Sequence, residues 1–290
     1  MLSQIQYKTP KDLTEATEML AEGKAKILGG GTDLIIQIRE KKINPKALID
    51  LSQIKEMKEI TIKSDILCIG AMSNFTSVAE NELIKKYFPI LAEAAESVGS
   101  PQIRNMATLG GNIVNGATAA DSIPALIALG AELRLHSKEN ERVVSAEGFI
   151  TGLNETAIQA GEILCSIEIP IKSNKKMAFI KLGRRKALAI SRINIAVVFE
   201  LDGEKKIKKA RLALGAVGTT AYRVTQVEEF LTGKCLSQET IDQAKLIIKQ
   251  LVKSNLGKRS TAAYKSEIAS AVLSKALWKI FDLEGREGNE

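Results

Sequence analysis

The first segment whose residue types could do chemistry is a run of three glycines, Gly29-Gly30-Gly31, followed by Thr32-Asp33-Leu34. Consecutive glycines allow left-handed backbone conformations and let several N–H groups point at one ligand. A helix after the run would add its N-terminal partial positive charge, which attracts phosphate. The chain has no Gly-Lys-Ser or Gly-Lys-Thr, and Leu34 stands where a dinucleotide fingerprint has its last glycine. A phosphate-binding loop and a plain tight turn both remain open.

A second segment, residues 99–121, is dense in small and hydrogen-bonding residues. Its chemically capable members are two adjacent glycines, three polar side chains and one carboxylate, namely Gly110, Gly111, Thr108, Asn112, Asn115 and Asp121. We predict a loop here, and a loop this long within a compact domain is usually functional or disordered. Its interspersed apolar residues argue against disorder. Two such loops in one domain suit a ligand with two phosphates and two aromatic ends.

The composition excludes several kinds of site. Among 290 residues there are one histidine, His136, and three widely spaced cysteines, Cys68, Cys165 and Cys235. An iron–sulfur cluster or a structural zinc needs about four such ligands, so we expect no metal site in this chain. His136 lies in an alternating stretch, and we predict a strand residue there rather than a catalytic base.

The charge and hydropathy of the chain limit the kinds of partner and the compartment that we expect for it. The 41 Lys and Arg against 34 Asp and Glu give a net charge of +7, but the acids are spread among the bases. Without a basic tract we expect no nucleic-acid binding. No apolar run approaches the roughly 20 residues of a membrane span, and the N-terminus lacks a signal-peptide pattern. The odd cysteine count fits a reducing compartment, so we predict a cytoplasmic protein.

The elements that must position the two segments form an α+β pattern. Strands at 25–28 and 47–51, with a helix at 34–40 between them, predict a small parallel sheet around the first glycine run. Further strands are predicted at 60–62, 67–70, 131–136, 141–145 and 162–170, with helices at 74–80, 89–98 and 123–129.

The pattern changes after a polar stretch at residues 171–176, which we take as a linker. Three alternating strands, 177–183, 191–201 and 208–217, predict a three-stranded antiparallel sheet. Helices are predicted at 226–232, 237–252 and 260–281. We therefore predict two domains, 1–171 and 172–290.

Taken together, Gly-Gly-Gly-Thr-Asp-Leu at 29–34 and Gln-Ile-Arg-Asn-x-Ala-Thr-Leu-Gly-Gly-Asn at 102–112 resemble the FAD-binding medium subunit of molybdenum hydroxylases. Residues 115–121 look most like the separate flavin subunit of bacterial xanthine dehydrogenases. The resemblance continues through 162–170 and 181–185. It implies an N-terminal FAD-binding domain of the PCMH/VAO type with subdomains at about 1–55 and 56–171, FAD between them, and a C-terminal domain with three strands and helices.

The resemblance also implies roles for matching residues. The first flavin loop would place backbone N–H groups on the pyrophosphate, and comprises Ile27, Leu28, Gly29, Gly30, Gly31, Thr32, Asp33 and Leu34. The second would surround the pyrophosphate and ribityl chain through Thr108, Gly111, Asn112 and Asn115. Asp121 would hold the adenosine ribose, Leu164 would pack on the ring system, and Lys181 would lie at the isoalloxazine edge, where a cation favours the reduced flavin.

Departures from the family sharpen these expectations. Three scattered cysteines exclude the branch with an extra four-cysteine cluster. Residues 29–34 contain no histidine, so FAD should be non-covalent. Val98 stands where some relatives offer a phenylalanine to the ring. Arg184 and Arg185 stay open between a solvated turn and contact with a nicotinamide phosphate or another subunit.

The resemblance implies a function divided among chains. Molybdopterin would lie in a large partner subunit and [2Fe–2S] clusters in a small one. This chain would pass electrons from the clusters through FAD to NAD or another acceptor, in a heterotrimer or a dimer of heterotrimers. Purines are the substrate class that the resemblance favours. The alternatives are a stand-alone FAD-dependent oxidoreductase, the flavin subunit of a nicotinate or carbon monoxide dehydrogenase-like complex, and a basic interaction module.

Overall fold

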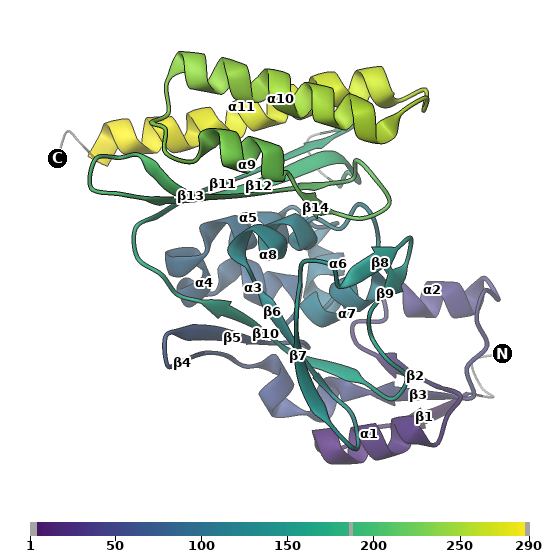
Figure 1. Cartoon of the computed structure of the whole chain (residues 1–290). Coiled ribbons are helices and arrows are strands. Elements are labelled where there is room, and N and C mark those ends of the chain that lie inside the picture. The colour runs from purple at the N-terminus through teal and green to yellow at the C-terminus, as the bar shows by residue number, and fades with distance from the viewer. Residues whose placement is uncertain (1–4, 186–187, 288–290) are drawn as a thin grey trace.

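The computed structural model of the chain describes residues 5–185 and 188–287 as a stack of sheets and helices (Figure 1). A small sheet with one covering helix lies at one end, followed by a larger sheet, a layer of short helices, a third sheet and a final helical layer. The predicted mixed α+β architecture is confirmed.

The first sheet is parallel, in the order β1-β3-β2. Its elements are β1 (Gln6–Lys8), α1 (Leu13–Ala21), β2 (Ala25–Leu28), α2 (Leu34–Arg39) and β3 (Ala47–Asp50). Asp12 begins α1, because its carboxylate accepts a hydrogen bond from the Glu15 amide. The sequence predicted β2, α2 and β3 but not β1, whose three residues pair with β3. Two 3₁₀ turns, Leu51–Gln53 and Lys55–Lys58, lead on to the second sheet.

The second sheet is antiparallel, in the order β4-β5-β10-β6-β7. Its strands are β4 (Ile60–Lys63), β5 (Ile66–Gly70), β6 (Glu132–His136), β7 (Glu141–Ser145) and β10 (Ile163–Pro170). His136 ends β6, as predicted for a strand residue. A separate two-stranded sheet joins β8 (Ile150–Gly152) to β9 (Glu155–Thr156).

Six short helices cover the second sheet: α3 (Phe75–Glu80), α4 (Glu82–Tyr87), α5 (Pro89–Glu96), α6 (Pro101–Met106), α7 (Leu109–Asn115) and α8 (Ser122–Leu129). The prediction that 99–121 is a loop is wrong, because α6 and α7 lie within it. Ser100 and Thr108 cap these helices, and Pro101 occupies the first turn of α6, where its missing N–H costs nothing. The cap of α3 is Asn74, whose side chain accepts a hydrogen bond from the Ser77 amide.

The third sheet has the order β11-β12-β13-β14. Its strands are β11 (Lys175–Gly183), β12 (Ser191–Leu201), β13 (Ile207–Gly215) and β14 (Tyr222–Arg223), and the helices are α9 (Thr225–Leu231), α10 (Gln238–Leu256) and α11 (Ala262–Glu287). The three predicted strands are present, and β14 adds a two-residue fourth strand. Because β11 begins at Lys175, the linker is shorter than predicted.

Both faces of the third sheet are buried, which explains how it joins the two halves of the chain. On β12, Ala196 and Val198 belong to the core that includes α5 and α8, whereas Ile195, Val197 and Phe199 belong to the core under α9, α10 and α11. This alternation follows the period of two along a strand. Side chains at even positions of β12 therefore face the N-terminal half of the chain, and Asn194 is one of them.

Candidate FAD site

The first glycine run connects β2 to α2 and adopts a conformation that other residues would not tolerate. Gly31 has a φ of +73°, in the left-handed region that favours glycine. A Cβ on Gly30 would lie 1.9 Å from the carbonyl oxygen of Met106. The amides of Gly30, Gly31 and Thr32 donate no hydrogen bond within the described part of the chain. Such a row of unused N–H groups fits a bound pyrophosphate.

The second predicted segment presents the start of α7. Thr108 is the N-cap, and its hydroxyl accepts a hydrogen bond from the Gly111 amide at 3.1 Å. Gly110 is buried against Ala71, whereas Gly111 is exposed, and a Cβ there would meet only Thr108 Oγ1 at 2.8 Å. Gly111 therefore leaves its surface open to a ligand, and Gly110 serves close packing inside the protein.

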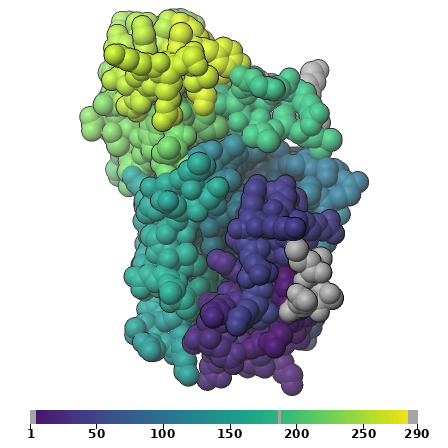
Figure 2. All heavy atoms as spheres, turned by 90° about the vertical axis from the view of Figure 1, so that its right-hand side faces the viewer, coloured from purple at the N-terminus to yellow at the C-terminus, as the bar shows by residue number. Residues whose placement is uncertain are grey.

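The two segments touch each other although about 75 residues separate them. A Cβ on Gly29 would lie 2.8 Å from Thr108 Oγ1, and Gly30 packs directly on the backbone of Met106 and Ala107. The fold thus brings the unused amides of residues 30–32 beside the N-terminus of α7. On the face shown in Figure 2, the surface is hollowed between the purple N-terminal part of the chain and the teal part that follows α7. This juxtaposition is the cradle that FAD requires, so the residues present fit the cofactor.

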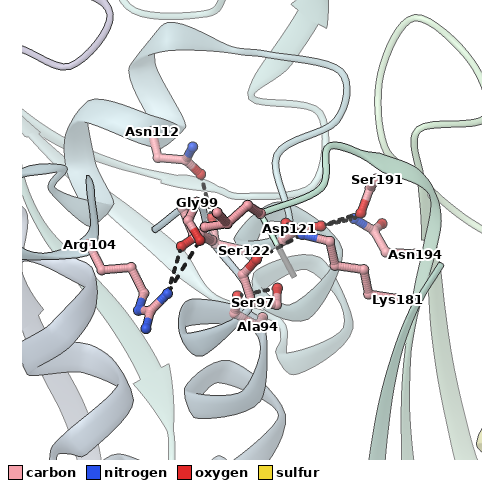
Figure 3. Close-up of polar contacts among 12 residues, drawn as sticks. Ala94, Ser97, Gly99, Arg104, Asn112, Asp121, Ser122, Lys181, Ser191 and Asn194 are labelled. Atoms are coloured by element: carbon pink, nitrogen blue, oxygen red, sulfur yellow. Dashed lines mark hydrogen bonds and ion pairs between the residues drawn. The ribbon is translucent and has the colours of Figure 1, made fainter. Parts of the chain in front are cut away.

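A buried polar cluster lies where α8 meets the third sheet (Figure 3). Lys181 Nζ on β11 donates to Asp121 Oδ2 at 2.6 Å and to the carbonyl oxygen of Ser97 at 2.8 Å. The side chains of Lys181 and Asp121 are only 14% and 7% exposed. Two further donors reach Asp121 Oδ1: Ser191 Oγ at 2.5 Å and Asn194 Nδ2 at 2.8 Å.

This cluster lies close to the second segment. Asn112 on α7 accepts a hydrogen bond from Ser122 Oγ at 2.7 Å, and Ser122 directly follows Asp121 (Figure 3). The structure therefore joins Asn112, Asp121 and Lys181 through adjacent contacts. The resemblance had assigned Asp121 and Lys181 to opposite ends of FAD, and those roles stay predictions. Their ion pair shows that the two side chains lie in direct contact.

The remaining predicted residues are less directly connected. Asn115 ends α7, before Gly116 in the left-handed conformation at a φ of +60°. Leu164 on β10 is 4% exposed within the hydrophobic core. Beside it, burial raises the pKa of the Cys165 thiol to about 12, so this thiol stays protonated and offers no nucleophile at neutral pH.

The sequence reasoning missed Ser97, Ser191 and Asn194. Asn194 carried a usable signal, because it is a polar residue between Ile193 and Ile195 in an apolar strand. Ser97 takes part through its backbone carbonyl, for which no side-chain pattern exists. Among the described residues no group of three or more His, Cys, Asp or Glu side chains could hold a metal ion. Within the same residues no helix is long and apolar enough to cross a membrane.

Comparison with known proteins covers nearly the whole chain. Residues 3–172 match the family described as the FAD-binding domain in molybdopterin dehydrogenase, and residues 178–280 match the CO dehydrogenase flavoprotein C-terminal domain. The nicotinate dehydrogenase FAD-subunit of Eubacterium barkeri is 32% identical, over 98% of this chain and 99% of that one. The xanthine dehydrogenase FAD-binding subunit of Escherichia coli O157:H7 is 31% identical, over 93% and 94%.

Solved structures of known enzymes also superpose on this chain over nearly its whole length. A chain of the carbon monoxide dehydrogenase of Hydrogenophaga pseudoflava superposes with a TM-score of 0.88 at 28% identity, covering 96% of this chain and 98% of its own. A chain of quinoline 2-oxidoreductase from Pseudomonas putida 86 gives a TM-score of 0.87 at 28% identity, covering 95% and 96%.

Proposed function

This chain belongs to the family of FAD-binding subunits of molybdopterin dehydrogenases, and we propose that it is the electron-transfer subunit of a xanthine dehydrogenase-like molybdenum hydroxylase. Electrons from [2Fe–2S] clusters in a small partner subunit would pass through FAD to NAD or another acceptor. Substrate hydroxylation would take place at molybdopterin in a large partner subunit. The observation that carries the proposal is the contact of the two glycine segments, which places unused backbone amides beside the start of α7 in an arrangement that suits a dinucleotide.

FAD supplies the chemistry of the site when bound, since it exchanges electrons both singly and in pairs. We propose that the unused amides of Gly30, Gly31 and Thr32 bind the pyrophosphate, together with the start of α7. Gly111 leaves room for the cofactor, and Asn112 and Asn115 provide polar groups along the ribityl chain. Leu164 excludes water on the inner side.

We place both Lys181 and Asp121 at the ring end of the site, because a 2.6 Å ion pair joins them. Two of the three ammonium N–H groups of Lys181 are used by Asp121 and Ser97, and the third has no acceptor among the described residues. That N–H is free to meet the cofactor. A cation there stabilises the negative charge that the ring gains on reduction.

The nicotinate and xanthine dehydrogenase subunits named above carry the names of different substrates. Their sequence identities to this chain are nearly equal, at 32% and 31%. A purine hydroxylase complex is our first proposal, because residues 115–121 resemble bacterial xanthine dehydrogenases. A nicotinate dehydrogenase-like complex is the alternative, since the Eubacterium barkeri subunit aligns over nearly its full length. A heterotrimeric assembly in the cytoplasm, with non-covalent FAD, completes the proposal.

Purification of the chain from its native cells tests this assignment. We expect a yellow protein that releases FAD on denaturation and that co-purifies with a larger and a smaller chain carrying molybdenum and iron. The isolated chain, saturated with FAD, should oxidise neither a purine nor nicotinate. Oxidation by the isolated chain would show a stand-alone oxidoreductase and overturn the proposal.

A further inference from the structure

Asn194 is buried in a way that costs stability. Its side chain is fully inaccessible to solvent, on a strand whose neighbouring residues are isoleucines. Its Nδ2 donates to Asp121, but its Oδ1 has no hydrogen-bond partner. An unsatisfied buried acceptor costs about 1–3 kcal/mol. An apolar residue here would avoid that cost, whereas the amide supplies a hydrogen-bond donor to Asp121.

The opposite strand is shaped around this amide. Gly215 on β13 pairs directly with Asn194. A Cβ at position 215 would lie 2.2 Å from Asn194 Oδ1 and 2.7 Å from Pro124 in α8. Gly215 is the last residue of β13, and the absence of a side chain there leaves the space that the Asn194 amide occupies. Gly215 thus makes room for Asn194, and the unpaired oxygen of Asn194 is the local cost of its contact with Asp121.

Ser191 supplies a second donor to the same carboxylate oxygen. It is 7% exposed, and its Oγ lies 2.5 Å from Asp121 Oδ1 and 3.4 Å from Asn194 Nδ2. With both neutral donors on Oδ1, the carboxylate plane is held so that Oδ2 faces Lys181. The third sheet therefore contributes Ser191, Asn194 and Lys181, and the FAD-binding half contributes Asp121.

The two neutral donors also change the electrostatics of the pair. A bare carboxylate 2.6 Å from Lys181 would cancel most of its positive field at the ring. Hydrogen-bond donors place partial positive charge on the carboxylate and offset its negative field. We propose that Ser191 and Asn194 are positioning residues that orient and partly neutralise Asp121, so that Lys181 presents net positive charge to the flavin ring. This inference rests on the proposed function, in which Lys181 lies at the ring edge.

Potentiometry on the full-length chain with FAD bound tests the inference. Ser191→Ala and Asn194→Ala should each lower the midpoint potential of the bound flavin, by less than Lys181→Met does. Ser191→Thr keeps the hydroxyl and should restore the wild-type potential. Ser266→Ala removes another buried hydroxyl of the C-terminal half, one that bonds Ala263 and not Asp121, and should leave the potential unchanged. FAD content and melting temperature are measured for every variant, and if Asn194→Ala does not fold, Ser191→Ala and Ser191→Thr decide.

The possible outcomes distinguish a failure of this inference from a failure of the proposed placement of Lys181 at the flavin ring. If Lys181→Met lowers the potential but Ser191→Ala and Asn194→Ala reduce only the melting temperature, the two residues are merely structural and the inference is wrong. If Lys181→Met also leaves the potential unchanged, Lys181 does not face the ring, and both the placement of Lys181 and the inference fail.

Discussion

At the scale of single residues, the adjacent glycines Gly110 and Gly111 of the second segment lie in different surroundings. A Cβ on Gly110 would lie 2.7 Å from the Ala71 carbonyl oxygen, inside the protein. Gly111 is exposed, and the nearest atom to its Cβ would be the Thr108 hydroxyl at 2.8 Å. The residue type alone therefore does not say which of the two glycines faces a ligand. The direction in which a Cβ would point distinguishes them.

Gly111→Val is the corresponding prediction. The chain should fold, because only the Thr108 hydroxyl must yield, but FAD affinity should fall by at least tenfold since the side chain fills the approach to the pyrophosphate. Titration of the apoprotein with FAD, followed by flavin fluorescence, measures the loss. Gly203→Ala is the control, because a Cβ there meets nothing within 4 Å and Gly203 has no positive φ. A folded Gly111→Val protein with wild-type affinity would remove Gly111 from the site.

At the scale of elements, the cap of α7 couples helix formation to the candidate site. Thr108→Val keeps the shape of the side chain but removes the acceptor for the Gly111 amide. Loss of an N-cap costs about 1 kcal/mol, and the misaligned amides should also weaken FAD binding. Asn81→Ala removes the cap of α4, which accepts from Leu83 and Ile84. Urea unfolding should show similar losses for both variants, and FAD titration should show a loss for Thr108→Val alone. Equal affinities would mean that the cap is structural only.

A second prediction concerns the start of β10. Arg142 makes a bidentate contact with Glu162, whose side chain is 7% exposed, and this contact lowers the pKa of Glu162 below its ordinary value near 4.5. A carboxyl whose pKa is lower in the folded state than in the unfolded state stabilises the protein at pH values above the unfolded-state pKa. This stabilisation is lost as the pH falls through the folded-state pKa. Glu162→Gln should therefore cost about 2 kcal/mol at pH 7.

Chemical unfolding measured from pH 7 to pH 3 tests this linkage. The difference between wild type and Glu162→Gln should be constant above about pH 5 and shrink below 4.5, because the wild-type carboxylate becomes protonated. Glu204→Gln is the control, since its ion pair with Lys206 is exposed and contributes little at any pH. A difference that does not change with pH would assign the stabilisation to packing rather than charge.

The elements also show what a sequence pattern can and cannot predict. Sequence pattern found β10, β12, α10 and α11, because each of these elements is long enough to carry several repeats of its period. It missed α6 and α7, since six- and seven-residue helices carry too few turns for a pattern and α7 contains two glycines. It missed β1 and β14, because strands of two or three residues exist only through their pairing. The two glycine segments were found from local chemistry, but the contact between them could be seen only in the fold.

At the scale of the whole molecule, the third sheet holds both halves of the chain. Its inner face packs on α5 and α8, and its polar residues reach Asp121 and the end of α8. The net charge of +7 is distributed over a surface on which many bases already have acidic partners. This distribution fits the anionic dinucleotide and the partner chains that we propose better than a nucleic acid. The arrangement predicts that the two halves unfold together.

Arg211 tests that cooperativity. From β13 its guanidinium donates to the carbonyl oxygens of Ile127 and Ala128, the last turn of α8, at 2.8 and 3.1 Å. The Ile127 carbonyl also accepts a hydrogen bond from the Gly130 amide at 3.1 Å, whereas Arg211 is the only donor to the Ala128 carbonyl among the described residues, so the contact from the other half helps to cap α8. Burial lowers the pKa of Arg211, yet a guanidinium remains charged at neutral pH. Arg211→Met should keep the apolar part of the side chain but leave the Ala128 carbonyl without a donor, at a cost of about 1–3 kcal/mol while that carbonyl remains buried. Calorimetry should then resolve two transitions where the wild type shows one.

Arg184→Met should retain the single transition, because Arg184 is exposed and makes no polar contact within the described residues. A single, merely earlier transition in Arg211→Met would show that the apolar contacts of the inner face suffice to couple the halves.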